Sequence, residues 1–304
     1  ENLSRMQENG RFAMDFLTKD IRMAGYQGCA SIKNIIPNVI IDISNPNPNP
    51  IPPSLTGGLN KVITGTNTVA ANWSASACGV SNECIANTDA LAIHKGGSCD
   101  GGLVGNLAAV NANIQIDAAN TCNISAYDIL IISDCSSADI FVATSSSVGA
   151  GKQTIAHAVN QNTSNNLSKA YGDDAEIYMS QTLSYFIRTG ANGQPALWRL
   201  DNNSPASTGT NPVELIEGIE NMQILYGEDA NADGAPNYYV PAGTAGLDMD
   251  QVVSIRISLL VRSMDDNLTL VPRAYIYNGA TTTPADRRLR RVFSSTIAVR
   301  NRLS

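Results

Sequence analysis

Charged residues and histidines are scarce in this sequence, and both scarcities limit the classes of function that it can have. Only 15% of the 304 residues are Asp, Glu, Lys or Arg, below the roughly 25% usual in globular domains, and the chain holds 2 histidines. It has no H-E-x-x-H, no G-x-S-x-G and no C-x-x-C, which are motifs of metal, hydrolase and thiol sites. Single acidic residues are scattered and mark no carboxylate pair. We therefore predict a protein that is not an enzyme, requires no cofactor and has no small-molecule substrate.

Two features come near such motifs. The string GAGKQT at 149–154 resembles a phosphate loop, but Ser146 stands where that motif has a glycine, and no Ser or Thr directly follows Lys152. We interpret the string as a turn. His94 and His157 belong to no catalytic constellation, and we expect them in loops or on a sheet surface.

Long apolar runs are also missing. No stretch reaches the roughly 18 apolar residues that a membrane span needs, and there is no signal peptide. The even number of cysteines favours disulfides in an oxidising compartment, so we expect that an export segment precedes Glu1 in the native protein. The sequence leaves the connectivity open, although close spacing favours Cys78–Cys84. The six cysteines are Cys29, Cys78, Cys84, Cys99, Cys122 and Cys135.

The net charge of −7 disfavours general binding to nucleic acid or to anionic membranes. Gly, Asn, Ser and Thr are abundant in the connecting stretches. This composition is typical of a β-rich extracytoplasmic protein with long polar loops.

The first 25 residues predict one amphipathic helix, in which Gly10 costs about 1 kcal/mol relative to Ala and Gly25 forms the C-terminal cap. Its apolar stripe is Leu3, Met6, Ala13, Leu17, Ile21 and Ala24, widened by Phe12, Phe16 and Met23. The sequence starts in helical phase with little that resembles a cap, so we expect the helix to continue upstream.

Short apolar or alternating runs predict strands. They lie at 89–95, 113–116, 127–133, 139–144, 183–189, 196–200, 222–226, 252–263, 275–277 and 292–299. The string NPNPNPIPP at 45–53 predicts an extended surface loop, with a proline-recognition ligand as the alternative. We predict an α+β fold in which the first helix lies across an antiparallel sheet, with a large β-rich insertion.

Four strings resemble PilW-type minor pilins of bacterial type IV pili. They are LSRMQENGRFAMDFLTKDIRMAGYQGC at 3–29, DILIISDCSSADIF at 128–141, GIENMQILYGEDANADGAPNYYV at 218–240 and RRVFSSTIAVRNR at 290–302. The first and last are specific to that family, and the last is very close to its usual C-terminus. The range 31–127 resembles nothing that we can place.

The resemblance implies one pilin-like globular domain over 1–304. Within it, 1–25 would be the C-terminal part of the pilin N-terminal helix, and about 181–304 the core antiparallel sheet. The range of about 30–180 would be the β-rich, disulfide-bearing insertion or sublobe. A hydrophobic helix upstream would anchor the subunit in the inner membrane, facing the periplasm, and later pack in the extracellular pilus.

The function that the resemblance implies is pilus assembly. The subunit would prime polymerisation with other minor pilins and sit at the pilus tip, beside the tip adhesin and above the major pilin. The alternative is a tip-exposed binding module, related to adhesion, twitching motility or DNA uptake, whose insertion contacts a surface, a glycan or DNA.

One loop has the spacing of a calcium site. Asp229, Asn231 and Asp233 precede Gly234 in the D-x-N-x-D-G pattern, and the peptide oxygen of Ala235 would be the next ligand. Val240 stands where the bidentate Glu is expected, although Asp248 or Asp250 could substitute. The resemblance adds that related pseudopilins bind calcium in this part of the fold. A polar hairpin turn is the alternative.

Positive charge gathers near the C-terminus. The run consists of Arg287, Arg288, Arg290, Arg291, Arg300 and Arg302. It could contact DNA phosphates or the acidic faces of neighbouring pilins, or form a solvated face. No aromatic residues alternate with these arginines as they do in many single-strand binders.

Overall fold

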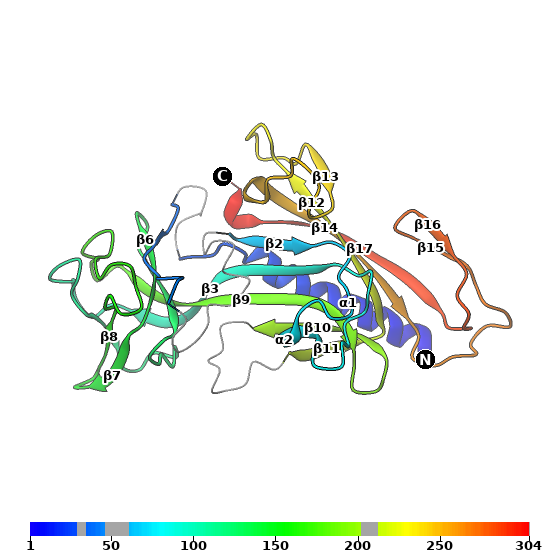
Figure 1. The fold of residues 1–304 in the computed structure, drawn as a ribbon, viewed down its shortest axis with the longest axis horizontal. Coiled ribbons are helices and arrows are strands. Elements are labelled where there is room, and N and C mark those ends of the chain that lie inside the picture. Colours follow the sequence, from blue (N-terminus) through cyan, green and yellow to red (C-terminus); the bar gives the residue numbers. More distant parts are fainter. Residues whose placement is uncertain (29–34, 46–60, 202–211, 304) are drawn as a thin grey trace.

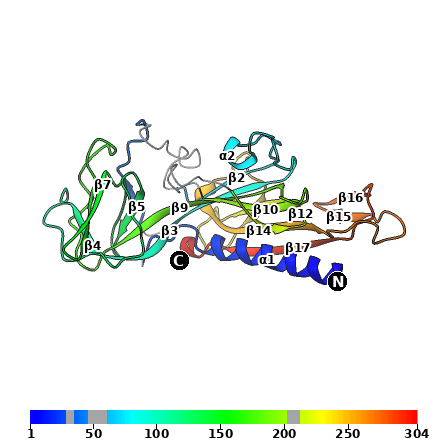
Figure 2. The same cartoon turned by 90° about the horizontal axis from the view of Figure 1, so that it is seen from below.

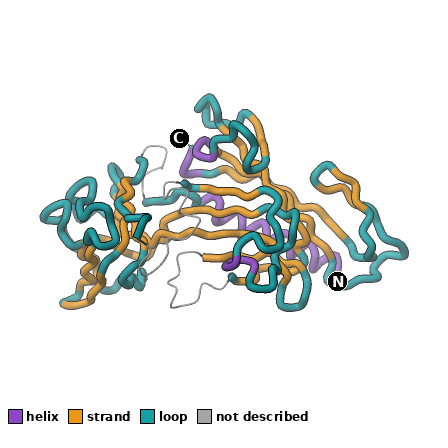
Figure 3. The backbone as a smooth tube through the Cα atoms, viewed as in Figure 1, coloured by secondary structure: helices purple, strands orange, loops and turns teal. Residues whose placement is uncertain are grey.

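The computed structural model describes residues 1–28, 35–45, 61–201 and 212–303. They form an elongated molecule that is mostly β-sheet (Figures 1 and 3). Strands make up 41% and helices 11%, with the strands divided among several sheets. The expected α+β pilin-like class is therefore wrong: one long helix accompanies a mainly β architecture. The Pro-rich string at 45–53 falls almost wholly outside the described residues.

The largest sheet has 8 strands. Its path is β1-β6-β5-β9-β10-β11, while β3 also pairs with β9 and β2 pairs with β3. The pairings are antiparallel except β1 with β6. The bounds are β1 (Asn38–Val39), β2 (Ile63–Thr66), β3 (Ala90–Gly102), β5 (Ile129–Ser133), β6 (Ala138–Val142), β9 (Glu176–Thr189), β10 (Pro195–Asp201) and β11 (Val213–Glu217).

Three smaller sheets complete the β structure. Their orders are β13-β12-β14-β17, β4-β8-β7 and β15-β16. The bounds are β4 (Ile114–Asp117), β7 (Ser145–Gly149), β8 (Lys152–Ala156), β12 (Ile219–Glu228), β13 (Tyr238–Val240), β14 (Val252–Arg262), β15 (Tyr275–Tyr277), β16 (Ala280–Thr282) and β17 (Arg290–Ala298). The helices are α1 (Asn2–Arg22), the short α2 (Ala75–Cys78) and the 3-10 turns η2 (Met249–Gln251) and η3 (Arg300–Arg302).

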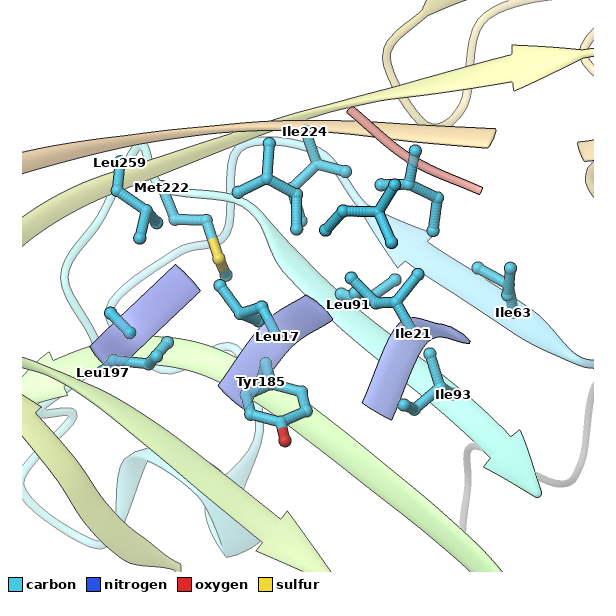
Figure 4. Close-up of a cluster of buried hydrophobic side chains, with 14 of the residues drawn as sticks. Leu17, Ile21, Ile63, Leu91, Ile93, Tyr185, Leu197, Met222, Ile224 and Leu259 are labelled. Carbon is cyan, nitrogen blue, oxygen red and sulfur yellow. The ribbon is translucent and has the colours of Figure 1, made fainter. Parts of the chain in front are cut away.

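The main core forms where α1 meets strands of the two larger sheets (Figures 2 and 4). Leu17 and Ile21 of α1 are fully buried there. The strand residues around them include Ile63, Leu91, Ile93, Tyr185, Leu197, Met222, Ile224 and Leu259. Burying this stripe stabilises α1 more than helix propensity does, since each fully buried aliphatic side chain contributes about 1.5–3 kcal/mol.

A buried polar cluster fixes the C-terminal turn of α1. Asp20 lies 2.7 Å from the Lys95 ammonium, 3.7 Å from Arg199, and accepts a hydrogen bond from the Tyr185 hydroxyl. Burial and the Asp20 charge raise the pKa of Tyr185 well above its usual range, so this hydroxyl remains a donor. The cluster joins α1 to β3, β9 and β10.

A second core fills the opposite end of the molecule. Ile114, Ile132, Phe141 and Ile155 are fully buried in it, together with Tyr171. We call residues 103–175 the distal lobe. Figure 1 places it at the far end from the N-terminus of α1. Because β3 and β9 contribute to both cores, these two long strands connect the lobe to the rest of the fold.

Two disulfides are present in the described residues. Cys78 bonds to Cys84 and Cys99 bonds to Cys122, both with side chains that are buried. The first joins the last residue of α2 to Cys84, in a small cluster with Trp73 and Phe186. The second joins β3 to the distal lobe. Cys29 lies outside the described residues.

Candidate interaction surface

No catalytic constellation forms around the two histidines. His94 bonds to Ser180 at 2.7 Å, and His157 bonds to the carbonyl oxygen of Ala112 at 3.0 Å. Both rings are buried, so the expectation of a surface position is wrong. His94 lies within β3, whereas His157 lies in the loop that follows β8, as expected for a loop position. Ile93 and Lys95 of β3 face α1, so the His94 ring between them points to the opposite face of the strand. The His157 ring packs against Phe141 in the distal lobe. Among the described residues, no group of three or more His, Cys, Asp or Glu side chains could hold a metal.

The calcium-like loop closes on itself. Asp229 accepts hydrogen bonds from the amides of Asp233 and Gly234, and Asp233 accepts from the amide of Ala235 and the side chain of Asn231. The bonds from Ala235 and Asn231 favour the charged form of Asp233 and lower its pKa.

The two residues that could complete a calcium shell are engaged elsewhere. Asp248 accepts from the amide of Asp250, while Asp250 lies 3.6 Å from Lys61 and 3.8 Å from Arg302. The described side chains do not gather the oxygen ligands that calcium takes. Calcium binding here stays a prediction.

Most of the C-terminal arginines are held by the protein itself. Arg290 forms paired bonds with Glu220 of β12 and with Asp286. Arg288 donates to the carbonyl oxygens of Ser263 and Met264. Arg302 donates to the carbonyl oxygens of Met249 and Val252, and burial lowers its pKa to about 10.

Arg287 bonds to Asn267. Arg291 and Arg300 are exposed, and neither donates a side-chain hydrogen bond to any described residue. The run is therefore not one uniform basic patch. The guanidinium groups of Arg290 and Arg302 serve the fold, and a contact with DNA or a partner through the run stays a prediction.

The last strand, β17, lies at the edge of its sheet. Within the described ranges its one strand partner is β14, and the pairing continues over nine residues without a register shift. Phe293 and Ile297 face α1, where the ring of Phe293 lies against Gly10. Val292, Ser294 and Thr296 point to the opposite face and are exposed. Sequence patterning placed a strand at 292–299 but carried no signal that its outer edge is open.

The exposed side of α1 carries an apolar stripe. Phe12, Phe16 and Met23 share one helical face and are 55%, 38% and 36% exposed. Asn9 and Arg5, next to this stripe, contact Glu217 of β11, so the stripe lies on the β11 flank of the helix. Arg11 and Arg22 are exposed on the flank that faces β17.

Residues 184–301 match the family model described as Type IV Pilus-assembly protein W. The matched part runs from within β9 to η3, and so includes the four-stranded sheet with β17 and the strands β10 and β11. It excludes α1 and the distal lobe. The W-family match thus covers many of the strands against which α1 packs. No curated protein and no solved structure matches the chain.

The described helices are α1, α2, η2 and η3. None of them is both long and apolar enough to cross a bilayer.

Proposed function

We propose that this chain is the globular part of a minor pilin of the PilW type and acts in type IV pilus assembly. The observation that carries the proposal is the match over 184–301 to the assembly-protein W family. The location of the match supports the proposal, because the matched strands β12, β14 and β17 bury the apolar face of α1. The four sequence strings that resemble the family support the same conclusion, and two of them lie outside the matched part.

The mechanism would be docking without chemistry. In this proposal α1 continues upstream into a hydrophobic helix that anchors the subunit in the inner membrane, with the globular part in the periplasm. The exposed stripe of Phe12, Phe16 and Met23 would then extend the packing surface of that helix towards neighbouring pilins. The partners would be other minor pilins, the major pilin and the tip adhesin, and the assembled position would be the pilus tip.

The test is genetic and uses the full-length protein. Deleting the gene should reduce surface pili at least about tenfold, counted by electron microscopy and by shearing, and wild-type complementation should restore them. Complementation with Phe12→Glu/Phe16→Glu should fail while the protein still accumulates. The matched control is Glu8→Gln, a change at an exposed position of the same helix. Normal piliation in the deletion strain would refute the proposal.

A second function is favoured by the distal lobe, which has its own core and lies at the opposite end from the start of α1 (Figure 1). At a pilus tip this geometry would present the lobe outward, as a module that binds a surface, a glycan or DNA. Its ends suit a clean deletion: the amide of Leu103 donates to the carbonyl oxygen of Ala175 at 3.1 Å, and Gly102 pairs with Glu176.

Gly102 can therefore be joined to Glu176 through Asn-Gly, the preferred two-residue hairpin turn. The deletion removes Cys135 and also Cys122, the partner of Cys99. Cys29 and Cys99, the two remaining cysteines outside the Cys78–Cys84 disulfide, would therefore be changed to Ala in this variant. Normal pili with lost adhesion would assign binding to the lobe. Loss of pili by a variant that accumulates and folds would assign the lobe to assembly. Retention of both pili and adhesion would exclude the binding module.

A further inference from the structure

The outer edge of β17 has the features of a site for strand addition. Natural proteins protect edge strands with bulges, prolines, inward charges or short length, because an open edge pairs with other chains. β17 spans nine residues with a regular register and no proline or lysine. By comparison, β13 has three residues and β1 two, and the pairing of β11 with β10 contains a register shift.

The hydrogen-bond phase of β17 follows from its two ends. The amide of Val299 donates to the carbonyl oxygen of Val253, and the amide of Ser263 donates to that of Leu289. These pairs continue the β14–β17 register, so the odd-numbered residues of β17 bond to β14. In an antiparallel ladder the alternate residues direct both backbone groups away from the partner. The amides and carbonyls of Val292, Ser294 and Thr296 therefore point away from β14, in the plane of the sheet and towards its outer edge.

The surroundings of this edge are cationic although the whole chain has a net charge of −7. Neither β14 nor β17 contains an acidic residue. Arg262 and Arg290 are neutralised by Glu220, but Arg256, Arg291 and Arg300 are exposed. Arg256 lies across from Thr296 on the outer face, stacked 4.1 Å above the Tyr239 ring. Arg11 and Arg22 of α1 flank the other face, with one acidic residue, Asp15, exposed between them.

We propose that β17 accepts an extended, acidic segment of a partner protein, which adds as a fifth strand to the β13-β12-β14-β17 sheet. Main-chain hydrogen bonds to Val292, Ser294 and Thr296 supply the affinity, as in other β-augmentation complexes. Arg256, Arg291 and Arg300 select acidic side chains on the added strand. The same arginines disfavour a second copy of β17 as the occupant, because like charges would meet. The inference deepens the proposed function, on which it rests, by naming the chemistry of one subunit contact.

The test uses the purified chain and a synthetic nine-residue peptide that alternates Val with Glu. Binding measured by fluorescence anisotropy should weaken as salt is added. Hydrogen exchange should show new protection at the amides of Val292, Ser294 and Thr296, while Phe293 and Ser295 are already protected in the free chain. The same peptide with Lys in place of Glu should bind at least about tenfold more weakly.

Two variants isolate the backbone contribution. Ser294→Pro removes an outward amide, which an edge strand tolerates, and should weaken peptide binding at least about tenfold. Ser294→Ala is its matched control, since both lose the side-chain bond to Ser258 but the alanine keeps the amide. Should Ser294→Pro not fold, N-methylating alternate amides of the peptide tests the same bonds on the wild-type chain.

Several results would overturn the proposal. They are equal binding of the Lys peptide, undiminished binding by Ser294→Pro or of the N-methylated peptide, protection at a different strand, and a wild-type dimer that Ser294→Pro converts to monomers. The last would identify a second copy as the occupant. The peptide-binding measurement is independent of the gene-deletion test of the proposed function. Peptide binding can fail while pili still require the chain, and normal pili in the deletion strain refute the proposed function whatever the peptide does.

Discussion

Gly10 is a residue at which α1 lies directly against the β17 side chain of Phe293. An added Cβ would lie 2.5 Å from the ring of Phe293, far inside van der Waals contact. From helix propensity alone, alanine would be better than glycine here by about 1 kcal/mol. The close approach explains why glycine is suitable instead, because it lets the aromatic ring lie directly on the helix backbone.

We expect Gly10→Ala to destabilise the protein by about 1–2 kcal/mol, since overpacking at a helix–strand contact exceeds the gain in propensity. Urea unfolding would measure the change, with Ser4→Ala at an exposed position of α1 as the control. Adding Phe293→Leu to Gly10→Ala should recover part of the loss. A rise in stability for Gly10→Ala would contradict the expected steric conflict.

Asp286 links the stability of the folded protein to pH in the acid range. The hydrogen bonds from Arg290 lower the pKa of Asp286 from 3.8 to about 2, against the opposing effect of burial. A carboxyl whose pKa is lower in the folded state stabilises that state above its unfolded pKa, and the stabilisation is lost as the pH falls from 4 through 2.

We therefore expect Asp286→Asn to be less stable than wild type at pH 7 and to lose less further stability between pH 4 and pH 2. Urea midpoints across this range measure both effects. Asp265→Asn, at an exposed position nearby, should follow the wild-type pH profile. Parallel profiles for Asp286→Asn and wild type would show that the Arg290 pair contributes nothing to acid stability.

At the scale of elements, α1 was predicted well because its apolar stripe is strong and local. The structure confirms a helix, Asn2–Arg22, close to the predicted 25 residues. Strands with clear alternation or apolar runs were also predicted, as at 252–263 and 127–133, which the structure has as β14 and β5. β7 has the sequence SSSVG and is largely exposed, so no hydrophobic period marks it.

The interaction surface was harder to predict because its chemistry depends on partners far away in the chain. Arg290 looks like part of one basic run, yet its acceptor Glu220 is 70 residues away. The same holds for Arg302, whose acceptor carbonyl of Val252 is 50 residues away. Local composition cannot show which cations are already paired, nor which edge of a sheet is open.

The Cys99–Cys122 disulfide should contribute strongly to stability. It closes a loop with a sequence separation of 23 and attaches the start of the distal lobe to β3. Loop-closure entropy gives about 3 kcal/mol for a loop of this size. We expect Cys99→Ala/Cys122→Ala to lower the free energy of unfolding by about this amount. Peptide mapping without reduction should show links 78–84 and 99–122; a different pairing would exclude this arrangement.

At the scale of the whole molecule, the fold has two main cores that share no buried residue. The expected class was wrong because the helix was treated as one of two main layers. Strands make up 41% of the structure and helices only 11%. The proposed division near residue 180 stays a prediction. β2 and β3, which precede that position, nevertheless contribute Ile63, Leu91 and Ile93 to the main core.

Separate cores should open separately. Phe141 is fully buried in the distal lobe, and Phe141→Ala should cost about 3–5 kcal/mol there. Hydrogen exchange should then accelerate in β5, β6 and the first residues of β9, while β14 remains protected. Leu259→Ala, in the main core, is the reciprocal variant and should leave β5 and β6 unchanged. Equal acceleration in both cores by either variant would indicate one cooperative unit.

The two long strands have a mechanical consequence. β3 and β9 run side by side along the length of the molecule and connect its two ends (Figure 1). Tension applied between the start of α1 and the distal lobe would act nearly parallel to these strands. Their cross-strand hydrogen bonds would then be loaded together in shear, whereas a pull across the sheet would open them one after another. A molecule built in this way should resist stretching best along its own long axis.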